Sequence, residues 1–165
     1  MFRNFAALKS INANVLAAGN ATSITRLFAN CPKLEEIDLT GISSSNFTSM
    51  VRVFEGCAGL KRINLTGWNT EKVSGTDADT GFYMMFSNCL KLENLKLGDA
   101  FLPVDGVKVT GMFSNAARDR DNASTVQAKI YCSDAMWAWL NTNLNDNGVN
   151  ADTGFNKFRF VHPTE

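Results

Sequence analysis

The chain has 165 residues, 45% of them hydrophobic, and its 16 Lys and Arg residues balance its 16 Asp and Glu residues. This length and apolar content predict one domain over residues 1–165 with a continuous core. The balanced charge, without a basic block, argues against a nucleic-acid partner. No apolar run is long enough to cross a bilayer, so we expect no transmembrane segment.

A repeat built on a phenylalanine anchor organises residues 1–125. The anchors are Phe2, Phe28, Phe54, Phe86 and Phe113. The position three residues after each anchor holds Phe5, Cys31, Cys57, Cys89 and Ala116. Leucine stands six residues after the first four anchors, and apolar residues stand nine and eleven residues after them. So many columns in register indicate stacked units that bury one shared core.

Each unit changes its apolar period in the middle. The apolar residues from Ile24 to Cys31 follow the spacing of one helix face, so we expect a short helix there. Ile37 and Leu39, two apart, predict a strand with both side chains on one face. Asn or Gly stands two residues after every anchor, and both tolerate the left-handed conformation that ends a helix. The expected fold class is α/β, a short right-handed solenoid with a parallel sheet on one face and short helices or turns on the other.

The units follow one another along the chain with small departures. Residues 1–26 form a degenerate first unit, residues 27–52 and 53–84 form regular copies, and residues 85–111 form a third. The unit that begins at Phe113 then drifts into a polar run. Because the chain opens inside a repeat, we expect the native protein to be longer at its N-terminus, although a true start would look the same.

The remaining residues, 126–165, predict a C-terminal capping unit. Their pattern gives a strand over residues 126–132, a helix over residues 135–140 that Ser133-Asp134 can cap, and a closing strand over residues 155–161. A solenoid needs such a unit to cover the open end of its core.

Three of the four cysteines, Cys31, Cys57 and Cys89, fall in one column of the repeat. Stacking in parallel register would point neighbouring thiols the same way, which is poor geometry for a disulfide. Their spacing matches no zinc pattern. We therefore expect buried free thiols.

Two stretches, Met85–Leu92 and Leu65–Val73, have a pattern that resembles a known family. The first reads Met-Phe-x-x-Cys-x-x-Leu. The second begins at a strand Leu and continues with an aromatic residue and Asn-Thr-x-x-Val. They resemble the leucine-rich repeats of the Bacteroides surface antigen type (BspA-like), over residues 1–116. The resemblance implies a leucine-rich-repeat solenoid of a bacterial protein, at the cell surface or secreted, that acts in adhesion and protein binding without catalysis. No signal peptide is visible at the start of this sequence, so the localisation rests on the resemblance.

Other motifs give weaker predictions. Asp79-Thr80-Gly81, in an insertion, and Asp152-Thr153-Gly154 match the catalytic triplet of aspartic proteases. Both follow polar residues, so we expect turns instead. The segment from Asn143 to Gly154 partly matches a calcium loop but lacks the Glu at its twelfth position. His162 is the only histidine, which argues against a catalytic triad. We expect no enzyme, no metal site and no cofactor.

The candidate binding surface is the strand face opposite the core leucines. Its residues are Glu36, Asp38, Arg62, Asn64, Asn94, Lys96, Lys129 and Tyr131. We expect them to form adjacent rows, acidic at one end and basic at the other, on the kind of extended face that solenoids use to bind partners. The alternative is a merely solvated face in which Glu36 and Arg62 make a weak surface pair.

Two functions follow from these alternatives. The first is a surface or secreted recognition module whose sheet face binds a protein of a host or neighbouring cell, with a glycan as an open possibility. The second is a structural spacer that presents another domain and binds nothing itself.

Overall fold

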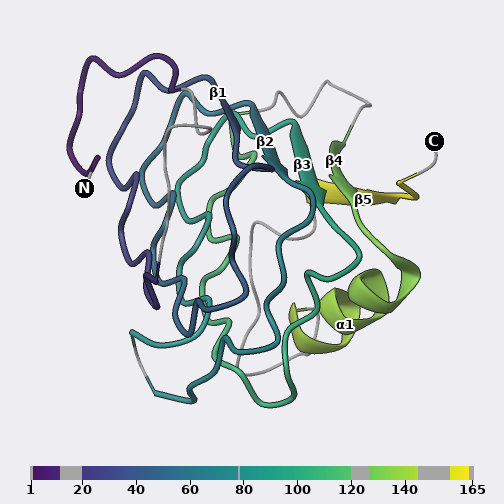
Figure 1. The fold of residues 1–165 in the computed structure, drawn as a ribbon. Coiled ribbons are helices and arrows are strands. Elements are labelled where there is room, and N and C mark those ends of the chain that lie inside the picture. The colour runs from purple at the N-terminus through teal and green to yellow at the C-terminus, as the bar shows by residue number, and fades with distance from the viewer. Residues whose placement is uncertain (1, 12–19, 78, 120–126, 145–156, 164–165) are drawn as a thin grey trace.

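A computed structural model of the protein describes residues 2–11, 20–77, 79–119, 127–144 and 157–163. These residues form an α/β fold with a five-stranded parallel sheet and one helix (Figure 1). The elements are β1 (Glu36–Asp38), β2 (Arg62–Leu65), β3 (Asn94–Leu97), β4 (Ala128–Tyr131), α1 (Asp134–Leu144) and β5 (Phe158–Val161). The strands lie in chain order, and Figure 1 shows the coils side by side from the purple N-terminal end to α1 and β5 at the other end.

The strands pair in the register that the repeat predicts. Ile37 lies opposite Ile63, Ile63 opposite Leu95, and Leu95 opposite Ile130. All four side chains are buried, because each strand turns the same alternate positions toward the interior. The outward side chains therefore also fall into rows across the sheet.

The phenylalanine anchors stack through the core. Ring centroids lie 5.8 Å apart for Phe28 and Phe54, 5.7 Å for Phe54 and Phe86, and 5.2 Å for Phe86 and Phe113. The four rings are fully buried. Phe158 of β5 packs on Phe113 at 5.2 Å with its ring tilted by 56°, so the stack meets the closing strand at its C-terminal end.

The segments before β1, β2 and β3 are series of turns, so the expected short helix over residues 24–31 is wrong. The left-handed column two residues after the anchor is confirmed, with positive φ at Asn4, Asn30, Gly56, Asn88 and Asn115. A second column, two residues before the anchor, also has positive φ: Arg26, Arg52, Met84 and Gly111. Alternating handedness turns backbone N–H groups toward the next coil, as Phe28 N donates to Val53 O at 2.9 Å and Asn30 N donates to Glu55 O at 2.7 Å. Bonds between coils thus replace those of a helix.

The C-terminal elements match the predicted strand, helix and closing strand. The Ser133 hydroxyl accepts a hydrogen bond from Met136 N at 3.2 Å, which is the expected N-cap of α1. β5 pairs in parallel with β4, and Trp137 of α1 stacks on Phe160 with centroids 5.5 Å apart. The first two residues of the predicted closing strand, 155–156, lie outside the described residues.

Candidate binding surface

The outward positions of the strands form two polar rows. The first row runs Glu36, Arg62, Asn94, Lys129 and Arg159, and the second runs Asp38, Asn64, Lys96 and Tyr131. All eight predicted residues lie in these rows. Arg159, which is exposed, was missed, although the alternation Phe158-Arg159-Phe160 places it on the outward face. Sequence alone did not give the register of β5 against β4.

A hollow of about 350 Å³ lies on this face of the sheet. Its lining includes seven of the eight predicted residues: Glu36, Asp38, Arg62, Asn64, Asn94, Lys96 and Tyr131. Ile37 and Ile63 complete it, and Lys129 stays outside. The repeat therefore gathers on one face side chains from four successive coils.

Hydrogen bonds and an ion pair fix the acidic end of the hollow. Glu36 makes an ion pair with Arg62. Asp38 accepts hydrogen bonds from the Thr40 backbone N–H at 3.0 Å, the Thr40 hydroxyl at 2.8 Å and Asn64 Nδ2 at 3.1 Å. The Thr40 N–H is the largest cause that lowers the pKa of Asp38, and the Thr40 hydroxyl, the Asn64 amide and the Lys96 charge lower it further. Both carboxylates are thus already partnered.

The same turn follows β2 but not β3. Asn64 Oδ1 accepts from Thr66 N at 3.2 Å and from the Thr66 hydroxyl at 2.8 Å, as Asp38 does with Thr40. In the next coil Lys96 takes the place of Asn64, and an ammonium group has no acceptor for such a turn. The Lys96 ammonium instead lies over the Tyr131 ring, 5.8 Å from its centroid.

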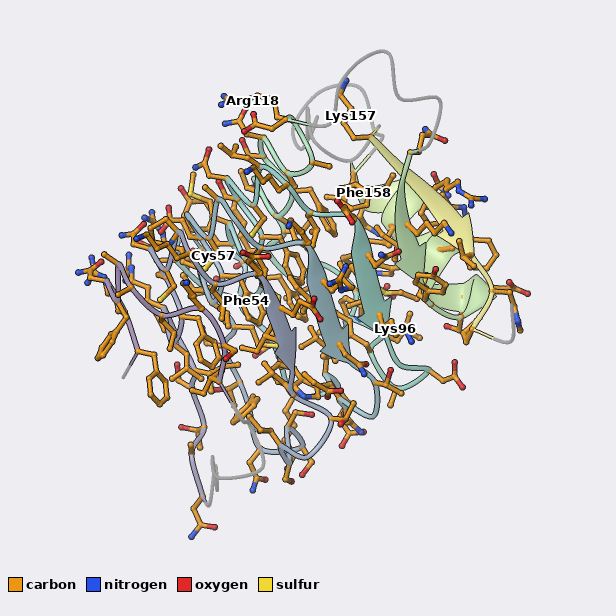
Figure 2. All side chains as sticks on the ribbon, turned by 90° about the horizontal axis from the view of Figure 1, so that it is seen from above. Phe54, Cys57, Lys96, Arg118, Lys157 and Phe158 are labelled. Atoms are coloured by element: carbon orange, nitrogen blue, oxygen red, sulfur yellow. The ribbon has the colours of Figure 1, made fainter. Side chains whose placement is uncertain are left out.

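A second hollow of about 500 Å³ begins where the first one ends. It lies at the carboxyl ends of the strands and is lined by Thr66, Lys96, Leu97, Gly98, Asp99, Tyr131 and Pro163. Lys96 and Tyr131 line both hollows. Figure 2 shows Lys96 near the carboxyl end of β3, on the opposite side of the molecule from Arg118.

The four cysteines are free and buried, as predicted. Three of the thiols donate to the carbonyl of an anchor in the preceding coil: Cys31 to Phe2 O at 3.0 Å, Cys57 to Phe28 O at 3.1 Å and Cys89 to Phe54 O at 3.2 Å. Burial raises the pKa of Cys57 to about 12 and holds that of Cys89 well above its usual value. These thiols are hydrogen-bond donors between coils and poor nucleophiles.

The first Asp-Thr-Gly copy is a turn, as predicted. Asp79 Oδ1 lies 3.4 Å from Arg52 Nε and 3.8 Å from Arg26 Nη2, so its carboxylate joins two coils electrostatically. The second copy, from Asp152, and residues 145–154 of the proposed calcium loop lie outside the described residues.

Over the described ranges, no three His, Cys, Asp or Glu side chains come together as a metal would require. None of the helical structure in those ranges is long and apolar enough to span a bilayer.

One comparison with known proteins gave a match. The family model described as "Mycoplasma protein of unknown function, DUF285" matches residues 1–126. No curated protein and no solved structure matches the chain. The matched residues contain all the phenylalanine anchors and β1 to β3. Because the match covers well over half of the 165 residues, the chain belongs to the DUF285 family.

Proposed function

We propose that this chain is a leucine-rich-repeat solenoid of the BspA-like type, at the cell surface or secreted, whose sheet face binds a protein partner. In-register parallel strands on successive coils, from β1 onward, and the stacked anchors support the solenoid architecture. The resemblance of Met85–Leu92 and Leu65–Val73 to that family supports adhesion as the biological setting. The partner is then a protein of a host or neighbouring cell.

The observation that carries the proposal is the hollow on the sheet face. Ligand sites are concave and place a few polar groups beside apolar surface. Here seven predicted polar or aromatic side chains surround one hollow, and a second, larger hollow adjoins it. The Asn94 side chain, in the middle of the first row, lies half-buried in this hollow. A merely solvated sheet needs no such concavity.

The groups with catalytic potential on the described coils have other tasks, which supports a non-enzymatic role. The thiols donate to buried carbonyls, and their raised pKa keeps them protonated. Asp79 is paired with two arginines instead of with a second carboxylate. His162 makes an edge contact with Phe160, at 6.4 Å between centroids. The two carboxylates that line the hollow also have partners: Glu36 pairs with Arg62, and Asp38 accepts hydrogen bonds from Thr40 and Asn64.

The test is affinity capture of proteins from host extracellular matrix and serum on the immobilised chain. The site variant combines Asn94→Arg with Lys96→Glu, which changes the centre of the hollow. The matched control combines Asn20→Arg with Lys33→Glu, the same two exchanges at exposed positions away from both hollows. All three proteins must first show the same thermal unfolding midpoint. We expect a protein that wild type and control retain and the site variant loses, followed by a dissociation constant for the purified partner.

Two outcomes would contradict the proposal. Equal retention by the site variant would remove the sheet face as the site. A complete lack of retained protein would favour the spacer. Loss of capture after the matrix proteins are deglycosylated would indicate that the recognised group is the glycan.

A further inference from the structure

We propose that the sheet face recognises an extended peptide segment whose acidic side chains lie over the β3–β5 end, where Lys96, Lys129 and Arg159 converge. The inference rests on the proposed function and names the chemistry of the partner. It follows from the charges that the face leaves without partners, from the spacing of those charges, and from the shape beside Tyr131.

The face carries an excess of positive charge although the whole chain is neutral. Its cationic side chains are Arg62, Lys96, Lys129 and Arg159, and its carboxylates are Glu36 and Asp38. Both carboxylates have partners within the face: Arg62 for Glu36, and Thr40 and Asn64 for Asp38. Over the described ranges, neither Lys96, Lys129 nor Arg159 lies within ion-pair distance of a carboxylate. Lys129 and Arg159 thus remain for a ligand, together with Lys96, whose ammonium lies over the Tyr131 ring but makes no ion pair within those ranges.

The strand spacing sets how the ligand's acidic groups are placed. Lys96, Lys129 and Arg159 stand on β3, β4 and β5, which are consecutive strands, and neighbouring strands lie about 4.8 Å apart. The three cations therefore span about 10 Å across the sheet. An extended peptide covers that distance with about three residues and turns alternate side chains the same way. Two carboxylates two residues apart on one side of the peptide would lie among the three cations, and a third on the same side would extend the run to five residues.

The second hollow gives this end a place for an uncharged side chain. Tyr131 and Lys96 line both hollows, Pro163 adds apolar surface to the second, and the Asp99 carboxylate also lines the second hollow. Because the Lys96 ammonium already lies on the Tyr131 ring, a carboxylate near Lys96 would lie beside an aromatic edge. The expected motif is therefore acidic residues next to an apolar or aromatic one.

Charge at the other end of the face distinguishes a peptide from a uniform polyanion. A sulfated glycan or a nucleic acid that continued along the hollow toward β1 would bring its negative charges to Asp38, whose lowered pKa keeps it ionised at neutral pH. Like charges brought together across an interface oppose binding. A peptide can change from acidic to neutral or basic within a few residues. The two-signed face therefore favours a peptide.

The test is selection of a random dodecapeptide display library on the full chain. Parallel selections use the variant Lys96→Glu/Lys129→Glu/Arg159→Glu and the matched variant Lys33→Glu/Lys91→Glu/Arg118→Glu. The second variant makes the same change in net charge at exposed residues outside both hollows. Both variants must keep the unfolding midpoint of wild type.

We expect wild type and the matched variant to enrich peptides with two or three Asp or Glu residues at alternate positions within five residues, and the face variant to lose them. For a selected peptide, fluorescence anisotropy should show binding at least about tenfold weaker after Glu→Gln replacement, since each exposed charge pair contributes modestly and three are lost. Binding should also weaken as salt is raised.

The remaining outcomes separate this inference from the proposed function. Peptides that bind in a face-dependent manner without acidic enrichment would overturn the acidic class and leave the proposed function standing. Heparin binding that the face variant loses, without any face-dependent peptide, would overturn the peptide class. Identical peptide selections on wild type and the face variant would overturn the inference, while the capture experiment above decides the proposed function independently.

Discussion

The substitution Gly56→Ala tests how tightly neighbouring coils are stacked. Gly56 has φ of +73°, and a Cβ on it would lie 2.3 Å from Asn30 Oδ1 of the preceding coil. Gly67→Ala is the matched control, because Gly67 has φ of +88° but open space where its Cβ would be. Both changes force alanine into the left-handed region, and only one adds a collision between coils.

The structure sets the size of the two effects. Left-handed backbone costs a residue with a Cβ about 1–2 kcal/mol, which applies to both variants. In Gly56→Ala the Asn30 amide must also move, which breaks its hydrogen bond to Asn4 Oδ1, 3.1 Å long. A hydrogen bond of this kind contributes about 0.5–1.5 kcal/mol. Urea unfolding should therefore show a loss of about 1.5–3.5 kcal/mol for Gly56→Ala, against about 1–2 kcal/mol for Gly67→Ala.

A second substitution identifies the cause. Asn30→Gly removes the colliding amide and keeps the left-handed backbone easy at that position, where φ is +58°. In the Asn30→Gly background, Gly56→Ala should cost no more than Gly67→Ala does in wild type. If Gly56→Ala is equally destabilising with and without the Asn30 side chain, the collision is not the cause and the reasoning about coil spacing fails.

Three further predictions concern buried and partnered polar groups. The pKa of Cys57 is raised from 9.0 to about 12, which implies about a thousandfold less thiolate than in the unfolded chain. Iodoacetamide at pH 8 should therefore alkylate Cys57 only after urea is added. Rapid labelling of the native protein, read by mass spectrometry, would contradict its burial. Because the pKa of the Cys57 thiol is raised in the folded protein, the stability that this raised pKa contributes is full below pH 9. It is lost between pH 9 and about 12, since the thiol of the unfolded chain ionises first. Trp68→Phe removes the indole N–H that donates to Leu39 O at 2.9 Å and should cost about 1–2 kcal/mol in urea unfolding, with no change in capture of a sheet-face partner. The lowered pKa of Asp38 stabilises the fold at pH values above 3.8, its ordinary pKa, and this stabilisation is lost when the carboxylate is protonated in acid. Asp38→Asn should therefore reduce the loss of stability below about pH 4. Parallel curves of stability against pH for the two proteins would contradict that role.

Strand register and the inward side of each strand were predictable from the sequence. Ile37, Ile63 and Leu95 occupy one column of the repeat, and a period of two fixes which side chains face outward. Asn30 and its equivalents were predictable because Asn and Gly are the usual residues of left-handed backbone. Those local preferences agree with the stacked arrangement.

The second left-handed column was not predictable, since Arg26, Arg52 and Met84 have no preference for positive φ. Bonds between coils, such as Arg26 N to Val51 O at 2.9 Å, hold this backbone and offset its local cost. The same limit applies to the candidate site. Columns of the repeat place side chains in rows, but they do not locate the hollow or show that Lys129 lies beside its lining.

The inward and outward positions of the sheet are under different physical constraints. Inward side chains stay apolar from strand to strand, because every coil must continue one core. Inside the coils, thiol, indole and serine groups pair with backbone groups of a neighbouring coil, as Cys57 does with Phe28 O and Ser44 with Asn69. Outward positions change from Glu36 to Arg62 to Asn94 although the backbone around them repeats, so stacking alone does not dictate their charge. Side chains that folding leaves without an ion pair are available to a partner, and in the described part of the chain Lys129 and Arg159 are such side chains at the β3–β5 end of this sheet.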